Sequence, residues 1–244
     1  MKRYYYDLHL HSCLSPCADN DSTPNNLAGM ASLSGLNLLA LTDHNSCKNC
    51  PSFFEACRKY NIIPIAGMEL TTAEDIHVVC LFENLSDAMK FDEELQSYRI
   101  LIQNRVDIFG EQLITDSCDN VISTEKHLLP NATKLSLDEV PDLVEKFGGI
   151  CYPAHIDRDA NGIIAILGTI PPTPKFKAVE IRDYDKLNTL MDKYSLHKMH
   201  IICDSDSHYL TDIRDAYHYF EFDLPSNDEE AVRKALFSFL RKEK

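Results

Sequence analysis

Near the start of the chain lies the stretch Tyr4-Tyr5-Tyr6-Asp7-Leu8-His9-Leu10-His11. Its aromatic and apolar residues predict a β-strand over Tyr4–Leu10. Residues two apart in a strand project from the same face, so the imidazoles of His9 and His11 can reach one point. Such a pair is either part of a metal site or an ordinary feature of a half-buried strand. The rest of the chain decides between these interpretations.

The chain continues as an alternation of short apolar runs and helical patterns. Further strands are predicted at Leu36–Leu41, Ile62–Ile65, Ile76–Phe82, Ile150–Tyr152, Ala178–Ile181 and His200–Cys203. Helices are predicted at 24–34, 52–60, 86–106, 136–147, 184–196 and 227–240. About seven strand–helix units predict a parallel sheet with helices outside, and they favour a distorted barrel over an open sheet. We expect one domain over residues 1–244, with an insertion at about 107–135.

Bulk composition narrows the classes of function. The chain is 44% hydrophobic and 25% charged, as in a globular protein. No apolar run approaches the roughly 20 residues of a membrane helix, and the first residues lack a signal-peptide pattern, so we expect a cytoplasmic protein with no membrane partner. The net charge of −14 argues against extended nucleic acid as a partner, which requires a basic face. A small phosphorylated substrate is still compatible, because bound metal ions can reverse the local field.

Side chains that bind metals recur where the predicted strands end. They are His9, His11, His44, Glu69, His77, His155, Asp206 and His208. Barrel active sites are built at the C-terminal ends of the strands, so these separate segments would deliver their ligands to one face. A single histidine at a strand end is more often structural. The joint pattern instead predicts a metal centre.

Five ordered motifs resemble the PHP (polymerase and histidinol phosphatase) family of metal-dependent phosphoesterases. They are Asp7-Leu8-His9-Leu10-His11-Ser12, Leu41-Thr42-Asp43-His44-Asn45, Gly67-Met68-Glu69, Pro153-Ala154-His155 and Ser205-Asp206-Ser207-His208. The resemblance runs from about residue 4 to 210. It implies a distorted (β/α)7 barrel of the PHP type that holds two or three divalent metal ions.

The resemblance also implies which residues share the metals. The first metal would take His9, His11, Glu69 and Asp206. Glu69 would bridge to a second metal, whose other ligands would be His77 and His155. A third metal would take His44, His208 and one residue of the loop after His11. Mixed imidazole and carboxylate ligands suit zinc, manganese or iron.

The loop after His11 departs from the family pattern. Pro16 stands where many relatives have an aspartate. Counting back from Thr23-Pro24 places Asp19 in register, and Asp19 is therefore our predicted loop ligand. Cys17 and Asp21 remain open as alternatives.

The activity implied is that of a metal-dependent phosphoric ester hydrolase. We expect a metal-bridging hydroxide at a di- or trinuclear site to attack a small phosphomonoester such as a nucleotide. Glu69 and Asp206 would be catalytic, as would Arg158, which stands three residues after His155 and would hold the phosphate. Lys48 and Arg182 are further candidates for holding the phosphate. The alternatives are a PHP-type nuclease and a non-catalytic metal-binding PHP module.

Other residues near the ligand motifs have open roles. Asp43 would orient a ligand imidazole, or else it is a turn residue. The pairs Cys13/Cys17 and Cys47/Cys50 would bind a separate structural zinc, form a redox-sensitive pair, or remain unpaired thiols. With nine cysteines and no secretion pattern, we do not expect a disulfide framework.

Overall fold

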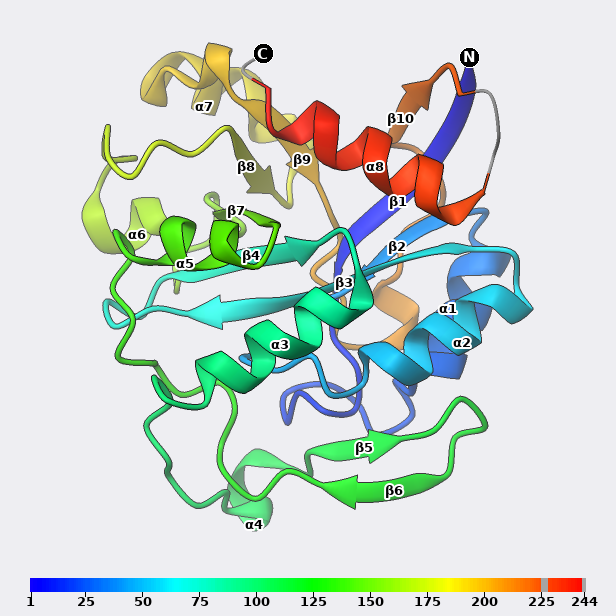
Figure 1. The fold of residues 1–244 in the computed structure, drawn as a ribbon. Helices are drawn as coiled ribbons and strands as arrows, with labels where there is room; N and C mark the ends of the chain where they lie inside the picture. The colour runs from blue at the N-terminus through cyan, green and yellow to red at the C-terminus, as the bar shows by residue number, and fades with distance from the viewer. Residues whose placement is uncertain (225–227, 243–244) are drawn as a thin grey trace.

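The computed structural model describes residues 1–224 and 228–242. Its main element is a six-stranded sheet in the order β10-β1-β2-β3-β4-β7. The strands are β1 (Lys2–Leu10), β2 (Leu38–Leu41), β3 (Ile63–Thr71), β4 (His77–Phe82), β7 (Gly149–Pro153) and β10 (Tyr219–Phe222). A separate parallel pair consists of β8 (Ala178–Ile181) and β9 (His200–Cys203). The chain after β9 returns to β1 through a bridge between Leu10 and Ser207, so the sheets together form a curled, distorted barrel (Figure 1).

Strand direction follows the sequence prediction in part. The pairs β1–β2, β2–β3 and β8–β9 are parallel, as expected. Strand β4 instead runs antiparallel to both β3 and β7. Residues 72–76 connect β3 to β4, and so short a connection cannot hold the crossover that a parallel pair requires. The distorted barrel is confirmed, whereas a uniformly parallel sheet was the wrong expectation.

Helices pack outside the sheet (Figure 1). They are α1 (Pro24–Leu33), α2 (Cys50–Lys59), α3 (Leu85–Leu95), α4 (Val106–Phe109), α5 (Val140–Lys146), α6 (Ile163–Leu167), α7 (Leu187–Tyr194) and α8 (Glu229–Leu240). Helix α1 begins as predicted, because Thr23 accepts the Asn26 amide and Pro24 occupies the first turn. Among the described residues, no helix is long and apolar enough to span a lipid bilayer.

Helix α3 (Leu85–Leu95) ends about three turns before the end of the range predicted for it, 86–106. The residues after α3 make backbone hydrogen bonds with a later segment of the chain instead of extending the helix. The amide of Lys134 donates to Tyr98, and the amide of Leu128 donates to Ile102. The expectation of a helix to about Val106 was therefore wrong, because tertiary hydrogen bonds replace the helical ones.

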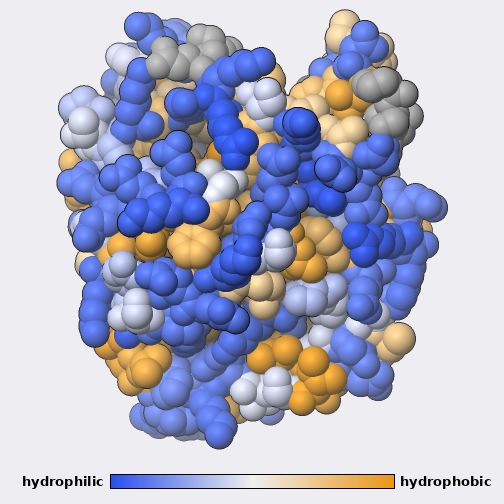
Figure 2. All heavy atoms as spheres, in the orientation of Figure 1, coloured by the Kyte–Doolittle hydropathy of each residue, from blue (hydrophilic) through white to orange (hydrophobic). Residues whose placement is uncertain are grey.

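Strands β5 (Leu113–Thr115) and β6 (Val121–Thr124) form their own antiparallel ribbon away from the barrel (Figure 1). The ribbon is fastened to the loop after β1, because the Leu113 amide donates to Cys13 at 2.8 Å. The face shown in Figure 2 is mostly hydrophilic, with apolar residues at its lower end, where α4 and β6 lie. Assigning this region as an insertion remains a prediction.

Gly67 on β3 lies where the sheet leaves no room for a side chain. A Cβ atom there would lie 2.6 Å from the Cys80 carbonyl oxygen and 2.8 Å from a methyl carbon of Leu81. This close packing sets the course of β3 two residues before Glu69.

We expect Gly67→Ala to destabilise the fold by ~1–3 kcal/mol, because overpacking forces backbone or side-chain shifts. Urea unfolding followed by circular dichroism measures the loss. Gly29→Ala in α1 is the control, since its new methyl group would meet only the end of the Tyr60 side chain at 3.3 Å. Equal unfolding midpoints for Gly67→Ala and the parent protein would contradict this packing argument.

Candidate metal centre

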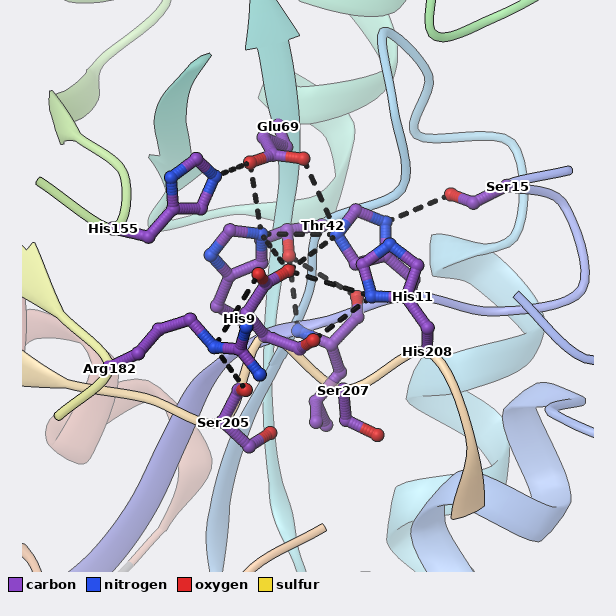
Figure 3. A network of polar contacts seen from close by, with 12 residues as sticks. His9, His11, Ser15, Thr42, Glu69, His155, Arg182, Ser205, Ser207 and His208 are labelled. Carbon is purple, nitrogen blue, oxygen red and sulfur yellow. Dashed lines mark hydrogen bonds and ion pairs between the residues drawn. The ribbon is translucent and has the colours of Figure 1, made fainter. Parts of the chain in front are cut away.

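The predicted ligands converge at one end of the barrel. His9 lies near the end of β1 and His11 directly follows that strand, Glu69 lies on β3, and His77 opens β4. The others follow the strands directly: His44 after β2, His155 after β7, and Asp206 and His208 after β9. Figure 3 shows the side chains of Glu69, His9, His11, His155 and His208 directed toward one another. The structure thus brings together eight of the nine predicted metal ligands, with Asp19 apart.

Glu69 is the centre of this arrangement. Its Oε1 lies 2.8 Å from His77 Nδ1, 2.9 Å from His155 Nε2 and 3.4 Å from His9 Nε2. Its Oε2 lies 3.0 Å from His44 Nδ1 and 3.4 Å from His11 Nε2. Burial would raise the pKa of Glu69, but the surrounding imidazoles hold that pKa well below its usual range. A fully buried carboxylate in contact with five imidazoles is thereby kept ionised.

His9 and His11 are oriented so that two nitrogen lone pairs face each other. His9 Nδ1 donates to Glu180 Oε2 at 2.7 Å. Ser15 uses its hydroxyl hydrogen toward Asp43 at 2.7 Å, so it accepts from His11 Nδ1 at 3.0 Å. Both Nε2 atoms therefore lack a hydrogen in the neutral rings, and they lie only 3.1 Å apart. The two lone pairs repel each other unless a metal ion or a proton lies between them.

The carboxylates around these two rings favour the protonated imidazoles. Burial lowers the pKa of His11, but the nearby carboxylates of Asp206 and Glu69 prevail and raise that pKa to about 9. His9 behaves likewise, because nearby Glu180, Glu69 and Asp206 outweigh burial and hold its pKa well above the usual value.

Asp206 completes the group. Its Oδ1 lies 3.6 Å from His9 Nε2 and 3.5 Å from His11 Nε2, and it is buried without a hydrogen-bond partner in the described chain. Its Oδ2 accepts from Arg158 at 2.7 Å, and Arg182 Nε lies 3.7 Å away. Asp206 and His155 adopt left-handed φ values of 53° and 26°. Strained backbone of this kind persists where the surrounding structure fixes it, as at functional sites.

The donor set fits divalent metal ions. Ligand atoms lie within 4.8 Å of one another in three groups: His9, His11 and Asp206; His44, Glu69 and His77; and His11, His44 and His208. Imidazole and carboxylate donors suit zinc, manganese or iron. The unpartnered Asp206 oxygen and the facing Nε2 atoms each offer a lone pair that a cation can accept.

Two groups that orient the imidazoles of β1 escaped the sequence analysis, namely Glu180 and Ser15. Glu180 is fully buried in the apolar strand β8, and its contact with His9 fixes that ring. The sequence signal that could have revealed Glu180 is an acidic residue within the apolar run Ala178–Ile181. Asp43 does not accept from a ligand imidazole directly, because it accepts from Ser12 and Ser15, and Ser15 contacts His11.

The loop after His11 places its candidates differently. Asp19 is exposed, and its carboxylate accepts the Asp21 amide at 2.9 Å. Asp21 is exposed as well. Cys17 is exposed too, but its thiol interacts with the buried His44: burial lowers the pKa of His44, while Cys17 and Glu69 raise it to about 9.

Two further predictions concern Lys48 and the pair Cys47/Cys50. The Lys48 ammonium group pairs with Glu125, and the Glu125 carboxylate also lies near Arg99. Lys48 is therefore engaged outside the metal centre. The thiols of Cys47 and Cys50 both face the Gly67 carbonyl, at 3.2 and 3.6 Å. Within the described chain no third metal-binding side chain joins these two thiols, and all nine cysteines are free.

Comparison with known proteins identifies the family. A model of the PHP domain matches residues 7–130, slightly more than half of the chain. The chain belongs to the PHP family of metal-dependent phosphoesterases. A 5'-3' exoribonuclease of Haemophilus influenzae is 32% identical over 130 residues, which cover 52% of this chain and 42% of that protein.

Solved structures share the PHP fold at low sequence identity. A lesion-specific endonuclease from Pyrococcus furiosus superposes with a TM-score of 0.65 at 18% identity, over 97% of this chain and 56% of the endonuclease. A protein from Bifidobacterium adolescentis named as a metal-dependent phosphoesterase gives a TM-score of 0.58 at 17% identity, over 96% of both chains. This PHP chain thus spans about half the length of the two nuclease relatives.

Proposed function

We propose that this PHP protein hydrolyses phosphate esters at the centre around Glu69, and that its substrate is a small phosphomonoester such as a nucleotide. The observation that supports this most strongly is the buried Glu69 carboxylate in contact with five imidazoles, with Asp206 and its arginines alongside. A cavity of about 540 Å³ opens beside Arg158 and Arg182, which is room for a compact substrate.

The proposed ligand assignment is the one implied by the family motifs, and the group of His9, His11 and Asp206 supports its first metal. His9, His11, Glu69 and Asp206 would hold the first metal, with Glu69 shared by a second metal on His77 and His155. His44 and His208 would hold a third. For the loop ligand of that third metal, Cys17 is the better candidate, because its thiol interacts with His44, whereas the Asp19 carboxylate accepts the Asp21 amide.

Divalent ions bound here would supply Lewis acidity toward the phosphate and toward water. The protein's own residues would orient the metal-binding imidazoles and balance the charge of the site. Glu180 and Ser15 fix the two imidazoles of β1. Arg158 and Arg182 stand where they can pass from the Asp206 carboxylate to the phosphate oxygens of a bound substrate.

The second candidate is a nuclease. The Haemophilus influenzae relative is named as an exoribonuclease, and the Pyrococcus furiosus structure is that of an endonuclease. The net charge of −14 argues for contacts confined to a short strand end rather than a long basic track.

A substrate panel separates the two candidates. Metal-loaded protein would be assayed for phosphate release from nucleoside monophosphates, sugar phosphates and histidinol phosphate, and for cleavage of single-stranded oligoribonucleotides. Turnover of monoesters supports the first candidate. Cleavage of oligonucleotides without monoester turnover would reject it in favour of the nuclease.

We expect Arg158→Ala to lower kcat/KM by about 10- to 100-fold, because a hydrogen bond between charged groups contributes roughly 1.5–3 kcal/mol. Arg158→Lys should recover part of this loss, since it keeps the charge but not the fork of donors. Arg105→Ala, at an exposed arginine of the 96–135 segment, is the control. Unchanged kcat and KM in Arg158→Ala would remove this residue from the site.

A further inference from the structure

We propose that Tyr184, which lines the cavity beside Arg158, forms a subsite for a nucleobase together with the adjacent rings of His218 and Tyr217. The inference rests on the proposed function and narrows its substrate class to nucleotides or the ends of short single strands. Its three aromatic residues are neither assigned metal ligands nor among the arginines proposed to hold the phosphate.

The cavity connects this region to the metal centre. Arg158 and Arg182 line the cavity next to Asp206, and Tyr184, Lys186 and Arg214 line it as well. Arg214 also lines a second hollow of about 180 Å³ together with Tyr217 and His218. The two hollows therefore both adjoin Arg214, and a molecule anchored at Asp206 and held by Arg214 would lie close to the rings of Tyr217 and His218.

Three aromatic rings lie together beside these hollows. The ring centroids of Tyr184 and His218 are 4.9 Å apart, and those of Tyr217 and His218 are 5.0 Å apart. Tyr184 is 49% exposed and Tyr217 is 75% exposed. Exposed rings beside arginines are the arrangement with which proteins stack bases while holding the backbone, because every base has a π-face.

The charges around the cavity favour an anion with an aromatic part. Four cationic side chains line it: Arg158, Arg182, Lys186 and Arg214. Three acids line it too, but two of them are engaged with the protein. Asp157 accepts the amides of residues 182 and 183, and Asp183 accepts the amide of residue 185 and pairs with Lys186 at 3.8 Å. A nucleotide satisfies both features, whereas a sugar phosphate leaves the rings without a partner.

The test compares two ligands that differ in the base. Non-hydrolysable phosphonate analogues of AMP and of ribose 5-phosphate would be titrated into metal-loaded protein by calorimetry. We expect the AMP analogue to bind about tenfold more tightly. Tyr184→Ala should reduce this ratio to about twofold, and Tyr184→Phe should retain it, because the phenyl ring still stacks.

Tyr60→Ala is the control, since that tyrosine is exposed at the end of α2 and outside both hollows. Equal affinity for the two analogues, or a ratio that Tyr184→Ala leaves unchanged, would overturn the subsite. Calorimetry needs no turnover, so the proposed function can fail separately: base-dependent binding without hydrolysis of any phosphate ester would reject the activity and support the subsite.

Discussion

Glu69→Gln protein should fold normally and lose phosphate ester hydrolysis by about 1,000-fold. The amide removes the charge that five imidazoles surround, and it cannot bridge two cations as a carboxylate does. Metal-centred stabilisation of charge in the transition state contributes several kcal/mol, and each 1.36 kcal/mol corresponds to tenfold in rate. Steady-state hydrolysis at saturating metal measures the loss.

The matched control is Glu94→Gln, which makes the same chemical change at an exposed position of α3. Circular dichroism and the unfolding midpoint of both variants separate a lost site from a lost fold. If Glu69→Gln keeps activity within tenfold of the parent, Glu69 does not bridge the metals.

Glu180→Ala should weaken metal binding by about 10- to 100-fold, which is the usual range for a residue that orients a metal-bound histidine. The 2.7 Å contact fixes the His9 ring and keeps its Nε2 free of hydrogen. Without it the ring can rotate and change tautomer. Competition with a chromophoric chelator measures the affinity directly, independently of turnover.

Glu180→Gln distinguishes orientation from bulk packing. The glutamine keeps the volume and an acceptor oxygen but loses the charge, so its metal affinity should lie between those of the parent protein and the alanine variant. A structural role alone predicts a lower unfolding midpoint with parent-like metal affinity in both variants, and that result would reject the orienting role of Glu180.

The sequence predicted most of the centre because ligand identity and strand ends are local properties. His9 and His11 share a face through strand periodicity, and the other motifs follow apolar runs that a buried strand requires. Any arrangement of the barrel that keeps these strands together also brings their ends together. The position of Glu69 amid the histidines therefore follows from the order of the strands.

What the sequence did not predict depends on contacts between distant segments. Helix α3 stops because residues 98–104 bond to residues 126–134, and Lys48 is drawn to Glu125 of the same segment. The role of Glu180 required the knowledge that β8 faces β1 across the barrel. Register counting chose Asp19, but the turn that Asp19 stabilises directs its carboxylate to a neighbouring amide, and Cys17 approaches His44 instead.

The most direct test of the metal centre is the number of metal ions per chain in the purified protein and in His9→Ala, measured by elemental analysis after removal of loosely bound ions. We predict two or three divalent ions per parent chain. His9→Ala should retain the fold and lose at least one of these ions together with the activity. A folded His9→Ala protein with the parent's metal content would contradict the account.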